Sequence, residues 1–161
     1  MPAEKLLIRP ATSADCELIL AFISGLAEYE RLAHEVVATP QKLEASLFGP
    51  DSATEVFIAE WEGVAAGFAL CFTSYSTFLA LPGIYLEDLF VYPQFRGKGI
   101  GKALLKHLAR LVVERDWGRL EWSVLDWNQP AIDFYLGFGA RAKDEWTQFQ
   151  LTGDALEQLA S

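Results

Sequence analysis

The sequence predicts an α/β fold in which a mixed sheet carries helices on both of its faces. Short apolar segments of strand length alternate along the chain with longer segments whose apolar residues recur at helical spacing. A Glu62-Gly63 pair between two apolar runs is typical of a hairpin turn. The chain has 161 residues, of which 52% are hydrophobic, so it can bury one core. We therefore expect a single domain over residues 1–161.

The N-terminal half begins with a short strand over residues 6–9, which Pro10 ends. Thr12-Ser13-Ala14-Asp15 has the sequence of a capping box, which predicts that a helix starts there. Apolar residues recur at helical spacing from Leu18 onward, so we expect this helix to end near Tyr29. The later elements of this half are a helix from Thr39-Pro40 to Gly49-Pro50 and two strands, over residues 55–61 and 64–74.

The C-terminal half continues the alternation. Between a loop over residues 75–83 and the end of the chain, we expect three strands and three helices. The strands are predicted at residues 85–91, 119–125 and 146–152. The helices are predicted after Gly101, over residues 128–136 with Asn128 as N-cap, and over residues 154–160.

The composition excludes some classes of function. Lys and Arg number 13 against 22 Asp and Glu, a formal charge of −9, which argues against nucleic acid as a partner. The charge suits a cationic small substrate, although an acidic, soluble surface explains it equally well. Cys16 and Cys71 lie in apolar patterns and are expected to be free buried thiols, which is consistent with a reducing cytoplasm. The His and Cys residues do not have the spacing of zinc ligands, so we expect no metal. We find no secretory leader and no apolar run long enough to span a membrane, so we expect no membrane association and a cytoplasmic location.

A glycine-rich loop follows the strand predicted at residues 85–91. It reads Arg96-Gly97-Lys98-Gly99-Ile100-Gly101 and opens a helical pattern, so its backbone amides and the helix N-terminus can together bind a phosphate or pyrophosphate. Ala103 after Gly101-Lys102 does not fit a P-loop, and the third glycine comes one place early for a dinucleotide fingerprint. The alternative is a turn that merely caps a helix.

Two carboxylates and a tyrosine are candidates for proton transfer. Glu87 and Asp88 lie within an apolar strand, where a carboxylate is costly unless it is paired or used. Neighbouring strand residues point to opposite faces, so both cannot face the core unless a bulge intervenes. Burial would raise the pKa of such a carboxyl toward that of a useful general base, whereas an exposed strand edge is the structural alternative. Tyr135 can donate a proton to a leaving thiolate, or it can be a core aromatic.

Taken together, these segments resemble the GNAT superfamily of N-acetyltransferases. The Arg-x-x-Gly-x-Gly loop resembles its acetyl-CoA pyrophosphate loop. Tyr85-Leu86-Glu87-Asp88-Leu89-Phe90-Val91 and Leu125-Asp126-Trp127-Asn128-Gln129 with Tyr135 resemble the diamine (spermidine/spermine) and thialysine N-acetyltransferase branch. Ile8-Arg9-Pro10-Ala11-Thr12 and Leu26-Ala27-Glu28-Tyr29-Glu30 extend the likeness over nearly the whole chain. The resemblance implies a GNAT-like domain with a mostly antiparallel sheet.

The resemblance also implies how acetyl-CoA binds as a cosubstrate without a metal. The backbone of Arg96, Gly97, Lys98, Gly99, Ile100 and Gly101 would hold the pyrophosphate. The main chain of Phe90 and Val91 would pair with the pantetheine arm, and Asn128 would contact the cofactor as well.

The same resemblance assigns roles in catalysis and in substrate binding. Glu87 would deprotonate the amine, directly or through water, and Tyr135 would protonate the departing sulfur. Tyr29, Glu30, Glu87 and Asp144 match positions that contact the amine in relatives. A role for Asp88 is left open. Family members are usually homodimers, so a homodimer is expected.

The predicted function is acetyl transfer to a primary amine of a small cationic substrate, either a thialysine-like amino acid or a diamine. Ser76-Thr77-Phe78-Leu79 replaces the Asp-Pro-Trp segment of the polyamine enzymes, which favours thialysine-like amines over spermidine. The alternatives are acetylation of a protein amine or an amine-bearing toxin, and a CoA-binding sensor without turnover.

Overall fold

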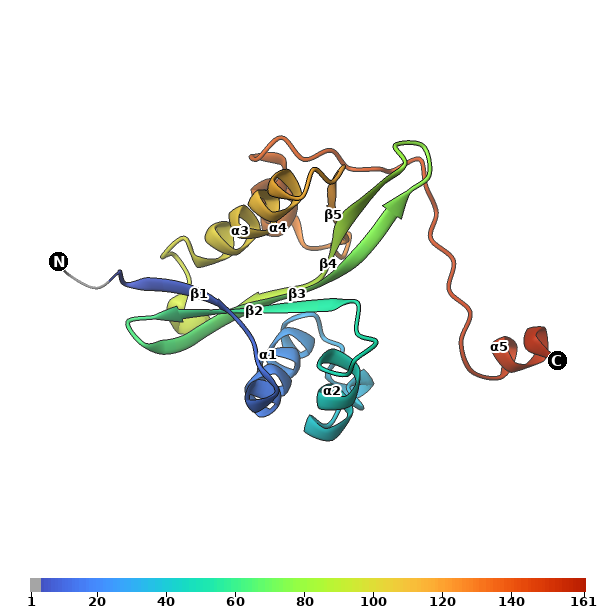
Figure 1. Ribbon diagram of the computed structural model, residues 1–161, viewed down its shortest axis with the longest axis horizontal. Coiled ribbons are helices and arrows are strands. Elements are labelled where there is room, and N and C mark those ends of the chain that lie inside the picture. The colour runs from blue at the N-terminus through green and yellow to red at the C-terminus, as the bar shows by residue number, and fades with distance from the viewer. Residues whose placement is uncertain (1–3) are drawn as a thin grey trace. The chain divides into compact units, whose positions relative to one another are not determined.

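The computed structural model describes residues 4–161, which form two compact units that divide after Ser123 (Figure 1). The elements of the first unit are β1 (Leu6–Pro10), α1 (Cys16–Tyr29), α2 (Pro40–Leu47), β2 (Thr54–Trp61), β3 (Val64–Ser76), β4 (Leu81–Val91), α3 (Ile100–Glu114) and β5 (Leu120–Trp122). Three short 3₁₀ turns, Ser13–Asp15, Ala33–Glu35 and Pro93–Phe95, connect them. The second unit contains α4 (Gln129–Leu136) and α5 (Gly153–Ala160).

The sheet lies in the first unit and has the strand order β1-β2-β3-β4-β5. The first four strands pair antiparallel with their neighbours, and β5 pairs parallel with β4. The predicted mixed, mostly antiparallel sheet is therefore confirmed. The predicted hairpin at Glu62-Gly63 is also confirmed, because Trp61 and Val64 face each other across that turn.

Helices cover both faces of this sheet, as predicted (Figure 1). On one side, α1 buries Ile19 and Phe22, and the ring of Phe22 stacks on that of Phe68 from β3 with 5.1 Å between centroids. On the other side, α3 buries Leu104 and Leu108, which repeat at the helical spacing seen in the sequence. The apolar stripes of these two helices thus fix them on opposite faces.

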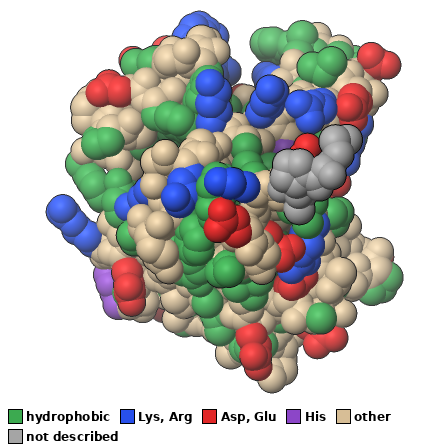
Figure 2. Space-filling model, turned by 90° about the vertical axis from the view of Figure 1, so that its left-hand side faces the viewer, with side chains coloured by type: hydrophobic (Ala, Val, Ile, Leu, Met, Phe, Trp, Pro, Cys, Tyr) green, Lys and Arg blue, Asp and Glu red, His purple; other side chains and the backbone are tan. Residues whose placement is uncertain are grey.

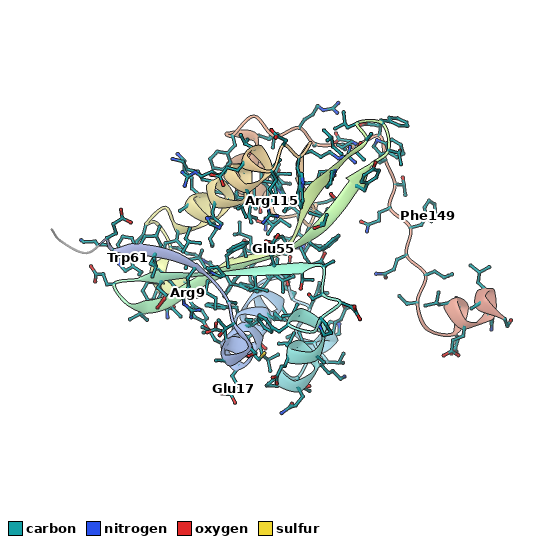
Figure 3. All side chains as sticks on the ribbon, in the orientation of Figure 1. Arg9, Glu17, Glu55, Trp61, Arg115 and Phe149 are labelled. Carbon is teal, nitrogen blue, oxygen red and sulfur yellow. The ribbon has the colours of Figure 1, made fainter. Side chains whose placement is uncertain are left out.

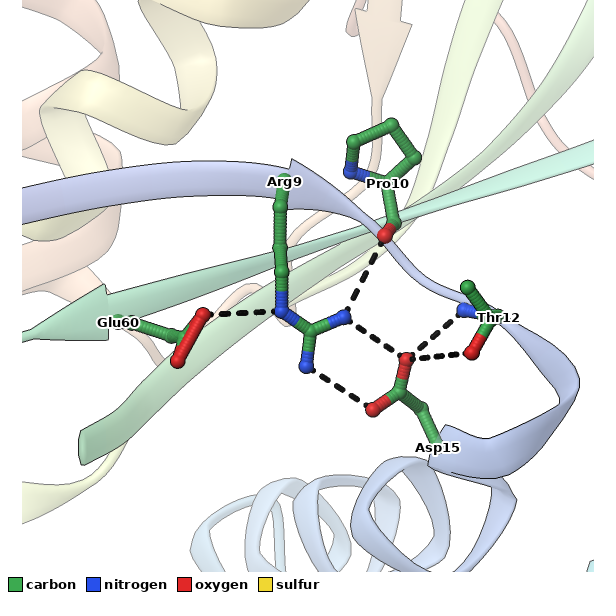
Figure 4. Close-up of polar contacts among 5 residues, drawn as sticks. All are labelled: Arg9, Pro10, Thr12, Asp15 and Glu60. Atoms are coloured by element: carbon green, nitrogen blue, oxygen red, sulfur yellow. Dashed lines mark hydrogen bonds and ion pairs between the residues drawn. The ribbon is translucent and has the colours of Figure 1, made fainter. Parts of the chain in front are cut away.

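Arg9 on β1 connects the sheet to the turn that leads into α1 (Figure 4). Its guanidinium donates two hydrogen bonds to the carboxylate of Asp15, both 2.9 Å long, and a third of 2.9 Å to Glu60 on β2. Asp15 in turn accepts the backbone N–H of Thr12 at 2.8 Å, as the predicted capping box requires. These contacts fix where α1 begins.

A second ion pair attaches the C-terminal end of α3 to the sheet. Arg115, directly after α3, donates to both carboxylate oxygens of Glu55 on β2, at 2.7 and 2.9 Å. Figure 3 shows the two side chains pointing toward each other. The ion pair thus connects the end of α3 to β2, while the start of α3 follows β4 after the turn Pro93–Phe95 and the glycine loop.

The strand predicted over residues 146–152 is wrong. These residues form no regular element, and all of them are exposed, including Phe149 at 90% (Figure 3). Alternating apolar residues make a strand only when another strand's edge accepts their hydrogen bonds. In the described part of the chain, no strand pairs with this segment.

Several predicted boundaries shift. β3 extends to Ser76 and β4 already begins at Leu81, so the loop expected over residues 75–83 is a tight turn. β5, in contrast, is shorter than predicted and has only three residues. The single domain over residues 1–161 stays a prediction. No helix within residues 4–161 is long and apolar enough to cross a membrane.

Candidate functional site

The glycine loop lies where β4 gives way to α3. Gly97 and Gly99 adopt φ values of 81° and 78°, in the left-handed region that favours glycine, and Gly99 is the N-cap of α3. Gly101 has no such backbone requirement, yet a Cβ built on any of these three glycines meets nothing within 4 Å. The loop therefore leaves open space at the first turn of a fifteen-residue helix, where unpaired N–H groups attract an anion.

The charged side chains of this loop contact aromatic rings. The guanidinium of Arg96 lies 5.3 Å from the ring centre of Tyr29 and 5.7 Å from that of Phe90, and its Nε donates to the Val91 carbonyl at 3.1 Å. Lys98 lies 5.2 Å from the ring centre of Trp61. Arg96 thus contacts three residues predicted for the site, namely Tyr29 at the end of α1, Phe90 and Val91.

The end of β4 is open along one edge. β5 pairs only with Ile84, Tyr85 and Leu86, while β3 continues beside β4 as far as Val91. From Glu87 to Val91, no strand of the described chain pairs with the edge on the β5 side. Phe90 and Val91 therefore lie on a stretch of β4 that has no neighbouring strand on this side, shortly before the glycine loop.

A β-bulge separates Glu87 from Asp88. Asp88 pairs with Leu70 and Leu86 with Cys71, which leaves Glu87 as an extra residue without a partner on β3. Glu87 is exposed, whereas Asp88 is half-buried. The sequence suggested that a carboxylate in this strand is buried. In the structure Asp88 is the carboxylate that is partly buried, whereas Glu87 is exposed.

Asp88 and Glu30 line one cavity of about 340 Å³ in the first unit. Its apolar wall comes from the C-terminal half of α1 and from residues 36–38. Arg31 adopts φ 63° directly after Glu30, the C-cap of α1, a left-handed conformation of the kind that ends helices. The third carboxylate of the lining is Glu35, and the lining contains no Lys, Arg or His. The cavity therefore suits a cation with an apolar body.

The environment of the cavity changes the acidity of its carboxyls. Burial, together with the neighbouring charges of Glu87 and Glu30, raises the pKa of Asp88 to about 6. Burial also raises the pKa of Glu30 above its ordinary value. Such perturbed carboxyls in a cavity are typical of a site that handles protons or binds cations.

The remaining predicted residues belong to the second unit. Asn128 is buried and caps α4, because its side chain accepts the backbone N–H of Ala131 at 3.4 Å, as the sequence predicts. Tyr135 is a half-buried residue of α4, whose ring centre lies 5.7 Å from that of Phe134. Asp144 is exposed in the segment that follows.

Sequence reasoning missed the contribution of residues 32–38. Glu35 and the apolar residues after it line the cavity, but nothing in their spacing distinguishes them from an ordinary loop. Sequence reasoning also left Asp88 without a role, because the sequence does not show whether a bulge occurs at the two adjacent carboxylates. Within residues 4–161, no group of three or more His, Cys, Asp or Glu side chains could hold a metal ion.

Comparison with known proteins gives consistent matches. The model of the acetyltransferase (GNAT) family matches residues 22–139. The chain is 36% identical to the thialysine N-epsilon-acetyltransferase of Sus scrofa, over 96% of each chain. It is 35% identical to the L-ornithine N5-acetyltransferase NATA1 of Arabidopsis thaliana, over 94% of this chain and 86% of that one. An integron cassette protein from the mobile metagenome of V. cholerae has a similar structure, with a TM-score of 0.82, 28% identity, and coverage of 98% of this chain and 99% of that one.

Proposed function

Because the chain belongs to the acetyltransferase (GNAT) family, we propose that it moves an acetyl group from acetyl-CoA to a primary amine of a small cationic substrate. The observation that carries the proposal is the open edge of β4, which leads into the glycine loop at the start of α3. Acetyl-CoA has a pyrophosphate and a peptide-like arm, and this arrangement offers a separate partner to each.

Residues of the loop would hold the pyrophosphate through backbone N–H groups, with Ile100 and Gly101 in the first helical turn. The open space at Gly97, Gly99 and Gly101 fits a ligand that approaches the backbone closely. The main chain of Phe90 and Val91 would pair with the pantetheine arm, and Asn128 would contact the cofactor, as the family resemblance implies.

The distribution of charge supports an anionic cosubstrate at this end of the fold. No Asp or Glu occurs between Asp88 and Glu114, although the chain has 22 of them. Five of the 13 Lys and Arg residues lie in the same stretch: Arg96, Lys98, Lys102, Lys106 and Arg110. Figure 2 shows several Lys and Arg side chains on the face that it draws. We expect the phosphates of acetyl-CoA to be attracted there.

The amine would occupy the cavity beside Asp88 and Glu30. Its carboxylates attract an ammonium group, and its apolar wall suits the methylene chain that carries it. The relatives named for thialysine and L-ornithine acetylation favour a lysine-like amino acid as the substrate, with short diamines next. Tyr29 and Asp144 are proposed as further contacts of the amine, as the resemblance implies.

The reaction needs one group that accepts a proton and one that donates it. An amine with a pKa of about 10.4 is protonated at neutral pH and cannot attack a thioester until a base removes its proton. The base is a carboxylate at the β4 bulge, for which the family resemblance suggests Glu87. Tyr135 is the proposed donor of a proton to the departing CoA sulfur.

The homodimer expected from the family is proposed for this chain as well. The second unit exposes large apolar side chains, among them Trp146 at 71%, Phe149 at 90% and Leu159 at 76%. Such exposure is typical of a surface that another chain covers. Sedimentation equilibrium of the whole protein tests the proposal, and a monomer at micromolar concentration would contradict it.

Calorimetric titration with acetyl-CoA tests the cofactor site. Gly101→Asp puts a negative charge and a side chain where the phosphates would bind, so we expect at least a tenfold loss of affinity. Gly101→Ala reports the effect of bulk alone, and alanine at this helical position is favourable for folding. Gln41→Asp is the matched control, because it adds the same charge at the second residue of α2. If Gly101→Asp binds as tightly as Gln41→Asp, the loop is not the phosphate site.

A further inference from the structure

The two charged residues of the glycine loop, Arg96 and Lys98, are both held by aromatic rings. Arg96 lies over Tyr29 and Phe90, while the ammonium of Lys98 lies 5.2 Å from the ring centre of Trp61. A cation within about 6 Å of a ring centre is attracted by the ring, and Trp is the best partner for such a contact. The position of the Lys98 side chain therefore depends on a residue of a distant strand.

The sheet gives Trp61 a fixed place. It is the last residue of β2 and pairs with Leu6 of β1 on one side and with Val64 of β3 on the other (Figure 3). Its side chain is half-buried. Lys98, in contrast, lies on an exposed loop between Gly97 and Gly99. The contact thus attaches a loop side chain to a residue that two neighbouring strands hold.

An aromatic ring holds the Lys98 ammonium without neutralising it. The carboxylates on both sides of Trp61 have other partners, because Glu60 accepts a hydrogen bond of 2.9 Å from Arg9 and Glu62 lies 3.8 Å from Lys5. A carboxylate would cancel the charge of an ammonium, whereas a ring is neutral and attracts the cation through its quadrupole. The charge of Lys98 can therefore still attract an anion.

A restrained lysine binds an anion at a lower entropic cost than a free one. Lysine side chains have many rotamers, and fixing them on binding reduces affinity. Trp61 already restricts Lys98 before any ligand arrives. Lys98 also directly precedes Gly99, the N-cap of α3, where the helix N-terminus favours negative charge. Side chain and helix therefore favour an anion at the same place.

From this placement we propose that Trp61 positions the ammonium of Lys98 to bind the pyrophosphate of acetyl-CoA. The inference rests on the proposed function and adds a side-chain contact to the backbone N–H groups proposed there. Trp61 is a positioning residue, which acts through Lys98. Because the ammonium recognises phosphate, the pair favours CoA thioesters over thioesters that lack phosphate.

Calorimetric titration of the whole protein with acetyl-CoA measures the contribution of each residue. Lys98→Gln removes the charge and keeps most of the side-chain length, so we expect the Kd to rise about three- to tenfold. Trp61→Leu removes the ring, and we expect a rise of about two- to fivefold, the range for a cation–π contact at an exposed site. Trp117→Leu is the matched control. Trp117 is also half-buried and contacts a cation, Arg115 at 4.8 Å, but it lies beyond the other end of α3. This variant should bind acetyl-CoA like the native protein.

The double variant Trp61→Leu/Lys98→Gln tests whether Trp61 acts through Lys98. In the Lys98→Gln background the ring has no ammonium to hold, so the further change at Trp61 should not weaken binding. The double variant should therefore have the same Kd as Lys98→Gln. Trp61→Phe keeps a ring and should bind more tightly than Trp61→Leu. If Trp61→Leu does not fold, Trp61→Phe replaces it in the same cycle.

A second readout separates positioning from general damage to the sheet. S-acetylpantetheine contains the thioester and the pantetheine arm but no phosphate. With this donor and thialysine as acceptor, Lys98→Gln and Trp61→Leu should keep the native kcat/KM. With acetyl-CoA as donor, each variant should lose kcat/KM by about the factor that it loses in affinity. A distorted sheet would lower kcat/KM with both donors.

Each outcome supports or overturns the inference. Native affinity of Lys98→Gln for acetyl-CoA would overturn it, as would an effect of Trp61→Leu that stays the same in the Lys98→Gln background. Equal losses with both donors would also contradict it. If the native protein does not bind acetyl-CoA, the proposed function itself fails. If it binds acetyl-CoA but acetylates no amine, only the transfer step of that function fails, and the titrations still decide the inference.

Discussion

At the scale of single residues, Arg9 shows how a polar side chain can fix a fold. It joins β1, β2 and the start of α1 through three short hydrogen bonds to carboxylates. The Arg9 guanidinium holds the pKa of Asp15 below its ordinary value of 3.8. Asp15 therefore stabilises the fold above pH 3.8, and this contribution is lost as the pH falls through its lower folded-state pKa.

Arg9→Ala should lower the free energy of unfolding by about 1.5–3 kcal/mol at pH 7, the range for hydrogen bonds to charged groups. The loss should shrink as the pH falls below 3.8. Urea unfolding at pH 7 and pH 3 measures it. Lys5→Ala is the control, because Lys5 makes only an exposed 3.8 Å pair with Glu62 and should change stability by less than about 0.5 kcal/mol. An Arg9→Ala loss that is the same at both pH values would contradict the explanation.

Tyr135 is the proposed donor of the proton to the departing CoA sulfur. Tyr135→Phe removes one hydroxyl, and we expect kcat to fall about 10²- to 10⁴-fold, the range for loss of a general acid. Acetyl-CoA affinity, measured by calorimetry, should be unchanged. Tyr75→Phe provides the control, because Tyr75 is 61% exposed on β3. Equal turnover by the two variants would remove Tyr135 from the mechanism.

At the scale of elements, periodicity and caps predicted most of the fold. The helices α1, α2 and α3 lie where apolar spacing, Pro40 and the glycine loop place them. The sequence also predicted the long strands β2 and β3, because their apolar runs lie on the two sides of the Glu62-Gly63 turn. The GNAT resemblance, based on the same segments, is confirmed by the family match over residues 22–139.

The features that escaped prediction depend on partners. Residues 146–152 have a strand-like composition but pair with no strand within the described chain. The bulge at Glu87 arises from register between β3 and β4, which no local pattern encodes. Consequently the sequence suggested a carboxylate at this point of β4, but the structure was needed to tell the exposed Glu87 from the cavity-facing Asp88.

At the scale of the whole molecule, charge is divided along the chain. The stretch between Asp88 and Glu114 is basic, and the cavity beside α1 is lined with carboxylates. A protein of net charge −9 thus offers one site suited to a polyanion and another suited to a cation. This division suits the proposed transfer from acetyl-CoA to an ammonium-bearing acceptor.

The most direct test of this account is an initial-rate panel with acetyl-CoA as donor and thiol release as readout. The acceptors are thialysine, L-ornithine, a short diamine, spermidine and a neutral aromatic amine, each at two salt concentrations. We predict that the lysine-like amino acids have the highest kcat/KM and that the KM of cationic acceptors rises with salt, because screening weakens their attraction to the cavity. A preference for the neutral amine without a salt effect, or no thiol release with any acceptor, would contradict it.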